Sequence, residues 1–202
     1  MRIGLTGGIA CGKSTVSNML RERGAQIVDA DVIAREVVAP GEEAWQQIIN
    51  CFGKELLLEN QEIDRAKLGS LVFFHEEARQ KLNGIVHPAV RKRMNELAQA
   101  EEEAGEEVII MDIPLLFESR LEYLVQKIIV VYCPEELQLE RLMKRNGFTK
   151  DEAINRIKSQ MPIEEKKKRG DFVIDNSGTI EETQKQVTGL YSMLLQDQNQ
   201  GS

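Results

Sequence analysis

The sequence feature that most constrains the fold is a glycine-rich motif close to the N-terminus. Residues 7–14 read Gly-Gly-Ile-Ala-Cys-Gly-Lys-Ser, which fits the pattern G-x-x-x-x-G-K-[ST], and they follow a short apolar run at residues 3–5. After the motif, Val16, Met19 and Leu20 recur at helical spacing, and Gly24 marks the end of that helix. A strand, this loop and a helix in that order are typical of a phosphate-binding loop. The alternative, a glycine-rich turn that precedes a lysine by chance, does not explain the order.

Each fixed position of this motif has a physical role in binding phosphate. The glycines let successive backbone N–H groups converge on the β- and γ-phosphates with no Cβ in the way. Lys13 adds a positive charge, the Ser14 hydroxyl is suited to ligate Mg²⁺, and the helix directs its positive end at the same oxygens. Cys11 is interpreted as a small filler side chain. The loop therefore predicts binding of a nucleoside triphosphate and leaves open what the phosphate is used for.

Five apolar runs rich in β-forming residues predict an α/β fold, a parallel sheet with helices on both faces. Each run is separated from the next by a helical pattern, which is typical of such sheets. About eighty residues separate the second run from the third. Because that is too long for one crossover, we expect a helical insertion with helices over 42–52, 64–74 and about 76–103, and a possible break at His87-Pro88. The five runs cover residues 3–5, 26–28, 108–111, 128–132 and 172–174.

Composition narrows the class of protein further. A chain of 202 residues that is 42% hydrophobic can bury one substantial core. No run approaches the roughly eighteen apolar residues of a membrane span, and we recognise no signal peptide, so we expect no membrane association. Three scattered cysteines without metal-ligand spacing indicate a reducing, cytoplasmic location. The net charge of −7 argues against a nucleic-acid partner.

The charge is spread unevenly along the chain. Residues 141–169 contain ten Lys and Arg and four acidic residues, a net charge of +6. On an acidic protein expected to bind a polyphosphate, such a segment suggests a movable lid over the phosphates. The best candidates to contact phosphate oxygens are arginines, whose planar fork matches them; an exposed salt-bridged helix face is the alternative. They are Arg141, Arg145 and Arg156, whereas Lys166, Lys167 and Lys168 are interpreted as solvated surface charges.

Carboxylates follow the strands where a parallel sheet places its ligands. Asp112 ends the apolar run at residues 108–111, a pattern that holds Mg²⁺ directly or through water beside a phosphate-binding loop. The second run is followed by Asp29-Ala30-Asp31. One of these two carboxylates is suited to cap the next helix, and the other to orient an acceptor hydroxyl near the γ-phosphate and take its proton late in transfer.

The chemistry suggested by these residues is phosphoryl transfer rather than a guanine-nucleotide switch. A switch protein should show D-x-x-G after the third strand and N-K-x-D after a later one. Here the third run continues as Asp112-Ile113-Pro114-Leu115, and no N-K-x-D occurs. His87 is either part of an acceptor pocket or a helix-break residue, whereas Trp45 is more typical of a core or an interface than of a base-stacking platform. A kinase acting on a small molecule is therefore favoured.

Several motifs, in order along nearly the whole chain, resemble the dephospho-coenzyme A kinase family. They include T-G-G-I-x-x-G-K-S-T at residues 6–15, D-A-D at 29–31, His87-Pro88 and D-x-P-L-L-F-E at 112–118. Further matches are Q-L-E-R at 138–141, Arg145, Arg156 with Gln160, and V-I-D-N-x-G at 173–178. The resemblance runs from residue 2 to about residue 190, and Cys11 replaces a residue that is usually small.

The resemblance implies transfer of the ATP γ-phosphoryl group to the ribose 3′-hydroxyl of dephospho-coenzyme A, the last step of coenzyme A synthesis. It implies a three-layer P-loop NTPase fold with a five-stranded parallel sheet of order 2-3-1-4-5. ATP would be bound by Lys13 and its loop, with Asn176 near the adenine; Arg141 would belong to the lid and Asp31 would be the base. The acceptor site would include Arg65, His87 and Leu115. The loop residues expected to bind ATP are Gly8, Ala10, Cys11, Gly12, Lys13, Ser14 and Thr15.

We therefore expect a single kinase domain, monomeric or as a homo-oligomer, with ATP as co-substrate and Mg²⁺ as its metal. Its core would cover about 1–40, 106–140 and 170–197, with an acceptor-binding insertion at about 41–105 and the lid at about 141–169. Two alternatives stay open. One is another P-loop nucleoside or nucleotide kinase, and the other is a non-catalytic module that binds ATP for regulation.

Overall fold

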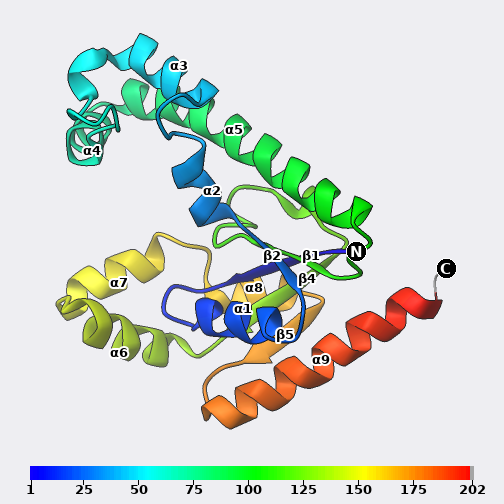
Figure 1. Ribbon diagram of the computed structural model, residues 1–202. Coiled ribbons are helices and arrows are strands. Elements are labelled where there is room, and N and C mark those ends of the chain that lie inside the picture. The colour runs from blue at the N-terminus through cyan, green and yellow to red at the C-terminus, as the bar shows by residue number, and fades with distance from the viewer. Residues whose placement is uncertain (201–202) are drawn as a thin grey trace. The chain divides into compact units, whose positions relative to one another are not determined.

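The computed structural model describes residues 1–200 and contains a five-stranded parallel sheet (Figure 1). The order β2-β3-β1-β4-β5 confirms the prediction made from the family resemblance. In the central strand, Leu5 is in register with Asp112 of β3 and Ile129 of β4. The ends of β1, β3 and β4 are therefore brought to one edge of the sheet. The strands are β1 (Arg2–Gly7), β2 (Gln26–Asp29), β3 (Ile109–Asp112), β4 (Lys127–Tyr132) and β5 (Phe172–Asp175).

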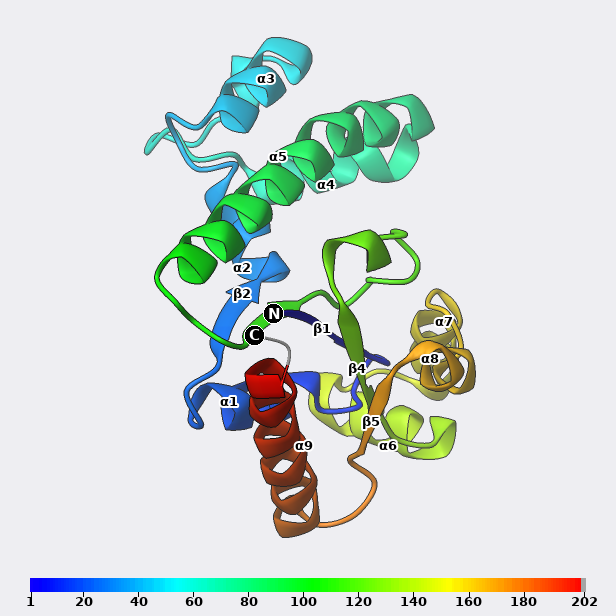
Figure 2. The same ribbon diagram turned by 90° about the vertical axis from the view of Figure 1, so that its right-hand side faces the viewer.

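The sheet is buried on both faces, as its continuous apolar runs require. Ile3 and Leu5 of β1, the Ile109–Met111 stretch of β3 and the Ile129–Val131 stretch of β4 are completely buried. Helices α1 (Lys13–Arg21) and α9 (Ile180–Gln200) pack together on one face, and α8 (Ile163–Arg169) contacts β4 on the other (Figure 2). This arrangement follows from right-handed crossovers that move from β1 toward β2 in one direction and from β4 toward β5 in the other.

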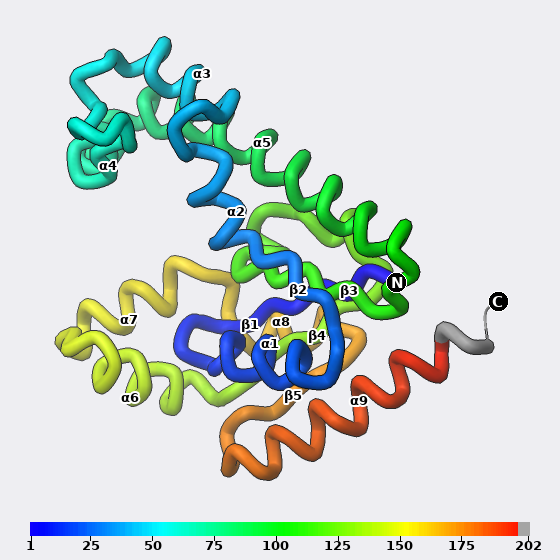
Figure 3. Tube along the Cα trace, in the orientation of Figure 1, coloured from blue at the N-terminus to red at the C-terminus, as the bar shows by residue number. Residues whose placement is uncertain are grey.

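Two further helices stand between β4 and α8, within the segment predicted as a lid. They are α6 (Glu135–Asn146) and α7 (Lys150–Lys158), which pack against each other and can be followed in Figure 3. Gly147 ends α6 in the left-handed conformation, with φ of 68°. Thr149 then begins α7 with a capping box, in which its side chain and that of Glu152 satisfy each other's backbone N–H groups. The turn between the two helices is thus defined by local chemistry.

The chain's internal contacts divide it into two units. The first contains residues 1–28 and the chain from Ala98 onward, and the second is Asp29–Leu97. The second unit is helical, as expected for the insertion between β2 and β3. It contains α2 (Ala30–Glu36), α3 (Glu43–Phe52), the 3-10 turn η1 (Lys54–Leu56), α4 (Arg65–Phe74) and most of α5 (Glu76–Glu103). A second 3-10 turn, η2 (Glu122–Leu124), belongs to the first unit.

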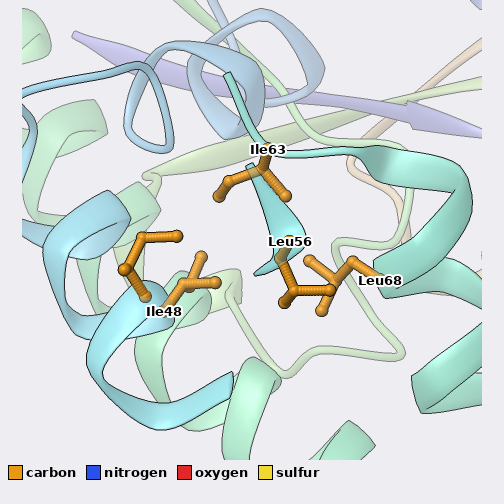
Figure 4. Packing of buried hydrophobic residues seen from close by; sticks show 5 residues of the cluster. Ile48, Leu56, Ile63 and Leu68 are labelled. Carbon is orange, nitrogen blue, oxygen red and sulfur yellow. The ribbon is translucent and has the colours of Figure 1, made fainter. Parts of the chain in front are cut away.

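The second unit has its own hydrophobic core (Figure 4). Ile48 and Ile49 of α3 pack with Leu56 of η1, with Ile63, which precedes α4, and with Leu68 of α4; all five are buried. The cluster includes a residue of α4, the helix that begins at Arg65, and side chains of α5, the helix that carries His87, pack against it. Those candidates therefore stand on a scaffold with a packed interior.

The helix at Glu76–Glu103 is continuous, so the possible break at His87-Pro88 does not occur. Proline removes one N–H from the helical ladder, but packing on both sides of it holds the helix. Before Pro88, Ile85 and Val86 pack on the core of the second unit. Beyond it, Met94 and Ala98 are completely buried. Among the residues that the structure describes, no helix is both long and apolar enough to cross a membrane.

Candidate active site

The glycine-rich motif forms a tight loop between β1 and α1. The Cys11 N–H donates a 3.1 Å hydrogen bond to the Gly8 carbonyl and so closes a turn. Gly12 takes the left-handed conformation, with φ of 86°. Helix α1 then begins at Lys13 with no side chain capping it. Because the first N–H groups of a helix have no acceptor within the helix, this start is suited to bind an anion.

Gly12→Ala is expected to damage the loop. An added Cβ would collide with the Nδ2 atom of Asn176, and the positive φ strains any side chain. The free energy of unfolding should fall by about 1–3 kcal/mol, with weaker ATP binding. Thermal unfolding and calorimetric titration with ATP would measure both effects.

Gly189→Ala is the matched control, because a Cβ at this position of α9 meets nothing within 4 Å. In a helix this replacement should stabilise the protein by about 0.5–1 kcal/mol. Equal stability losses in the two variants would contradict our account of Gly12.

Lys13 and Asp112 meet as an ion pair between the phosphate loop and the end of β3. The Lys13 Nζ donates to Oδ1 of Asp112, whose side chain is only 2% exposed. Leu5 of β1 and Asp112 of β3 share one register position, and this adjacency explains the contact. A strand-end carboxylate thus lies beside the lysine expected to bind phosphate.

Asn176 is hydrogen-bonded to the phosphate loop. Its Nδ2 donates to the Cys11 carbonyl at 2.8 Å, and its Oδ1 accepts from the Thr183 hydroxyl at 2.8 Å. Arg141 of α6 completes the connection by donating from Nη2 to the Asn176 carbonyl at 2.9 Å. The side chain of Asn176 is therefore engaged with the phosphate loop, and its position beside an adenine stays a prediction.

Two thiols meet beneath the loop. The Sγ atoms of Cys11 and Cys133 lie 3.3 Å apart, and both residues are completely buried. The hydrogen bond with Cys133, and then burial, raise the pKa of Cys11. Cys11 consequently stays a neutral thiol and adds no negative charge where phosphate is expected. This supports its interpretation as a filler side chain.

The two carboxylates after β2 have different local roles. Asp29 is the N-cap of α2, and its Oδ1 accepts from the N–H groups of Asp31 at 2.8 Å and Val32 at 3.1 Å. Asp31 lies in the first turn of α2 and is exposed. Of the two roles that the sequence left open, capping belongs to Asp29, and Asp31 is the carboxylate that capping does not occupy.

The acceptor-site candidates are divided between the two units. Leu115 follows β3 in the first unit and is 42% exposed, whereas Arg65 and His87 are exposed residues of the second unit. Arg65 lines a cavity of about 270 Å³ with the apolar side chains of Val38 and Leu68. A larger cavity of about 710 Å³ in the same unit is lined by α2, α3 and α5, and includes Pro88 beside His87. The second unit thus offers hollows to a bulky ligand.

Three basic residues have contacts that the sequence did not indicate. Arg145 donates to Asn146 on the same helix, and Arg156 lies 3.8 Å above the ring of Phe148. The prediction that Lys166 is a solvated surface charge was wrong, because this lysine is completely buried. It follows the buried Ile163 by three residues, which places both on the inward face of α8. That spacing was the signal in the sequence that could have identified it.

A parallel sheet of order 2-3-1-4-5, a G-x-x-x-x-G-K-S loop and a strand-end aspartate paired with the loop lysine define a P-loop kinase. Shikimate kinase from Bacteroides thetaiotaomicron shares this fold, with a TM-score of 0.51 and 18% identity over 96% of this chain and 98% of that one.

The chain belongs to the dephospho-CoA kinase family, whose family model matches residues 1–182. It is 55% identical over 190 residues to the dephospho-CoA kinase of Geobacillus kaustophilus, covering 94% of each chain. The solved dephospho-CoA kinase from Campylobacter jejuni is similar over 97% of this chain and 98% of that one, with a TM-score of 0.77 and 32% identity. The membership expected from the sequence motifs is thereby confirmed.

Proposed function

We propose that this protein transfers the γ-phosphoryl group of ATP to the ribose 3′-hydroxyl of dephospho-coenzyme A, giving coenzyme A and ADP, the final step of coenzyme A biosynthesis. The observation that carries this proposal is the 55% identity to a named dephospho-CoA kinase over 94% of both chains. The phosphate loop, the uncapped start of α1 and the Lys13–Asp112 pair provide the backbone N–H groups and the charges that binding a phosphoryl donor requires.

The donor half of the reaction is assigned to the first unit. The loop amides and Lys13 would bind the phosphates of ATP, and Arg141 would contact them from α6 as part of a lid. Ser14 and Asp112 would hold Mg²⁺, which supplies positive charge to the β- and γ-phosphate oxygens. Among the described residues no three acidic, histidine or cysteine side chains gather around one point. Proteins usually bind Mg²⁺ through one or two side chains, water and phosphate.

The acceptor half is assigned to Asp31, with Arg65, His87 and Leu115 as substrate-binding residues. The carboxylate of Asp31 would orient the ribose hydroxyl and take its proton as the bond to phosphorus forms. A loose transition state places little demand on the base, so an exposed aspartate is adequate. The guanidinium of Arg65, beside apolar side chains, suits a ligand that carries both phosphates and a hydrocarbon arm. We also propose a cytoplasmic location, which suits the three free cysteines.

A screen of acceptors tests the assignment. ADP formation is measured with MgATP and one of four acceptors: dephospho-coenzyme A, adenosine, a nucleoside monophosphate or shikimate. We expect dephospho-coenzyme A to give at least about tenfold more ADP than any other acceptor, because a site built to bond one substrate's polar groups rejects analogues that lack them.

Three results of the screen would contradict the proposal in different ways. If dephospho-coenzyme A gave no more ADP than buffer, the assignment would be wrong. A better nucleoside or nucleotide acceptor would indicate a different kinase. Tight ATP binding with no acceptor-stimulated turnover would indicate a regulatory module.

A further inference from the structure

One lysine of α8 is buried at the base of the phosphate loop. Lys166 is 0% exposed, and its Nζ atom contacts three oxygens. It donates to the carbonyls of Gly7 at 3.1 Å and Pro114 at 3.3 Å, and it pairs with Oε1 of Glu118 at 2.8 Å. An ammonium group has three N–H donors, so these contacts use all of them.

The two carbonyls belong to the segments that carry the donor site. Gly7 is the last residue of β1 and the first of the phosphate loop, and Pro114 follows Asp112 by two residues. The Thr6 hydroxyl donates to the same Pro114 carbonyl at 2.9 Å. Lys166 therefore connects the segment that leads to Lys13 with the segment that begins at Asp112.

The chain just before Lys166 makes two more contacts of this kind. Oε1 of Gln160 accepts from the Ile9 N–H at 2.9 Å, inside the phosphate loop. Oε1 of Glu118 accepts from the Met161 N–H at 2.9 Å. The stretch from Gln160 to Lys166 is thus bonded to the phosphate loop at Ile9 and at Gly7, and Figure 2 shows the α8 end of this stretch beside β4.

Stability alone does not account for a charge in this place. Taking a lysine and a glutamate out of water is costly, and apolar residues of similar volume are often equally stable or more so. Here the cost is compounded, because among the described residues Oε2 of Glu118 is buried with no hydrogen-bond partner. The arrangement gains instead a rigid, directional link between two loops, which an apolar side chain could not provide.

We propose that Lys166 is a positioning residue for phosphoryl transfer, whose ammonium group sets the spacing between the phosphate loop and the Asp112 segment. The proposal rests on the phosphoryl-transfer function proposed above. Because Lys166 is completely buried and its donors are already used, it would act through the backbone that bears Lys13 and Asp112 rather than through contact with ATP or acceptor. A displacement of about 1 Å between these segments would cost about a hundredfold in rate.

The test separates positioning from folding by removing the charges one at a time and then together. Lys166→Met leaves the Glu118 carboxylate without its cation, so the unfolding midpoint should fall by about 10 °C. Lys166→Met combined with Glu118→Gln removes both charges and should recover most of that loss. Its kcat should nevertheless stay at least about tenfold low, and its Kd for MgATP should be raised, because methionine has no N–H donor to replace the ammonium group between the two carbonyls. Lys166→Arg, which keeps the charge and the donors, should be less impaired than the double variant.

Lys127→Met is the matched control, because it removes an exposed lysine at the first residue of β4. The Nζ atom of Lys127 pairs with Oδ1 of Asp171 at 3.9 Å. The kcat of this variant and its Kd for MgATP should equal those of the wild type. The proposal is overturned if the double variant regains kcat and MgATP affinity along with stability, or if Lys127→Met loses as much. The calorimetric measurement of Kd for MgATP does not depend on turnover. If the wild type bound MgATP but phosphorylated no acceptor, the proposed function would be wrong, and the Kd values of the variants would still decide whether Lys166 positions the phosphate loop.

Discussion

Asp31→Asn is expected to lower kcat with dephospho-coenzyme A by about 10²–10⁴-fold, the usual loss when a general base is removed. ATP should still bind with wild-type affinity, because the phosphate loop does not include this residue. Asparagine has nearly the shape of aspartate but cannot accept the proton of the ribose hydroxyl. Steady-state ADP release and calorimetric titration with MgATP, run on the same preparation, would separate the two effects.

Asp29→Asn is the control for this experiment, because it changes the neighbouring carboxylate in the same way. Asp29 caps α2 through its Oδ1 atom, and asparagine caps helices about as well as aspartate. We expect kcat to change by less than about twofold and the unfolding midpoint to be unaltered. Retained kcat in Asp31→Asn, or an equal loss in both variants, would refute the assignment of Asp31 as the base.

Lys13→Met is expected to lower kcat/KM for ATP by about 10²–10³-fold, a loss comparable to that of one preorganised donor at a developing charge. Unlike Asp31→Asn, it should also weaken MgATP binding, because the proposed contact of the ammonium group with phosphate would be made in the ground state as well as in the transition state. Lys13→Arg keeps the charge but not the compact ammonium shape, so an intermediate loss is expected. Calorimetry with MgATP and single-turnover kinetics would measure the two contributions.

The ion pair with Asp112 requires a stability measurement beside the kinetics of Lys13→Met. Removing Lys13 takes away one partner of a carboxylate that is 2% exposed, so some destabilisation is expected. Lys13→Met with Asp112→Asn should relieve it without restoring turnover, since both proposed roles are then lost. MgATP affinity in Lys13→Met within twofold of the wild type would show that the lysine does not bind phosphate in this protein.

The strands, the loop and the sheet were predictable because each has a local signature. Apolar runs gave the five strands to within a residue or two, and the G-x-x-x-x-G-K-S pattern gave the loop between β1 and α1. The strand order came from the family resemblance, because periodicity within each run does not say which runs are neighbours. The break expected at Pro88 was wrong, because packing on both sides of the proline outweighs one missing hydrogen bond.

Long-range side-chain contacts were not predictable from the sequence. Lys166 and Glu118 are 48 residues apart in the chain, and nothing local to either indicates that they pair. Three consecutive lysines read as solvent-exposed unless the helical face of each is known. The contact of Asn176 with the phosphate loop spans 165 residues and was missed for the same reason. Which of Asp29 and Asp31 caps α2 depended on backbone geometry that the tripeptide alone does not reveal.

The contact between Lys13 and Asp112 has a thermodynamic consequence for how the binding of one ligand affects the binding of another. These two groups serve as counter-ions to each other. If phosphate takes Lys13, Asp112 loses its cation, and if a divalent ion takes Asp112, Lys13 loses its anion. Only the arrival of both ligands together gives each group a new partner of the right sign. Nucleotide and metal should therefore raise each other's affinity by the same factor, as reciprocity of linked equilibria demands.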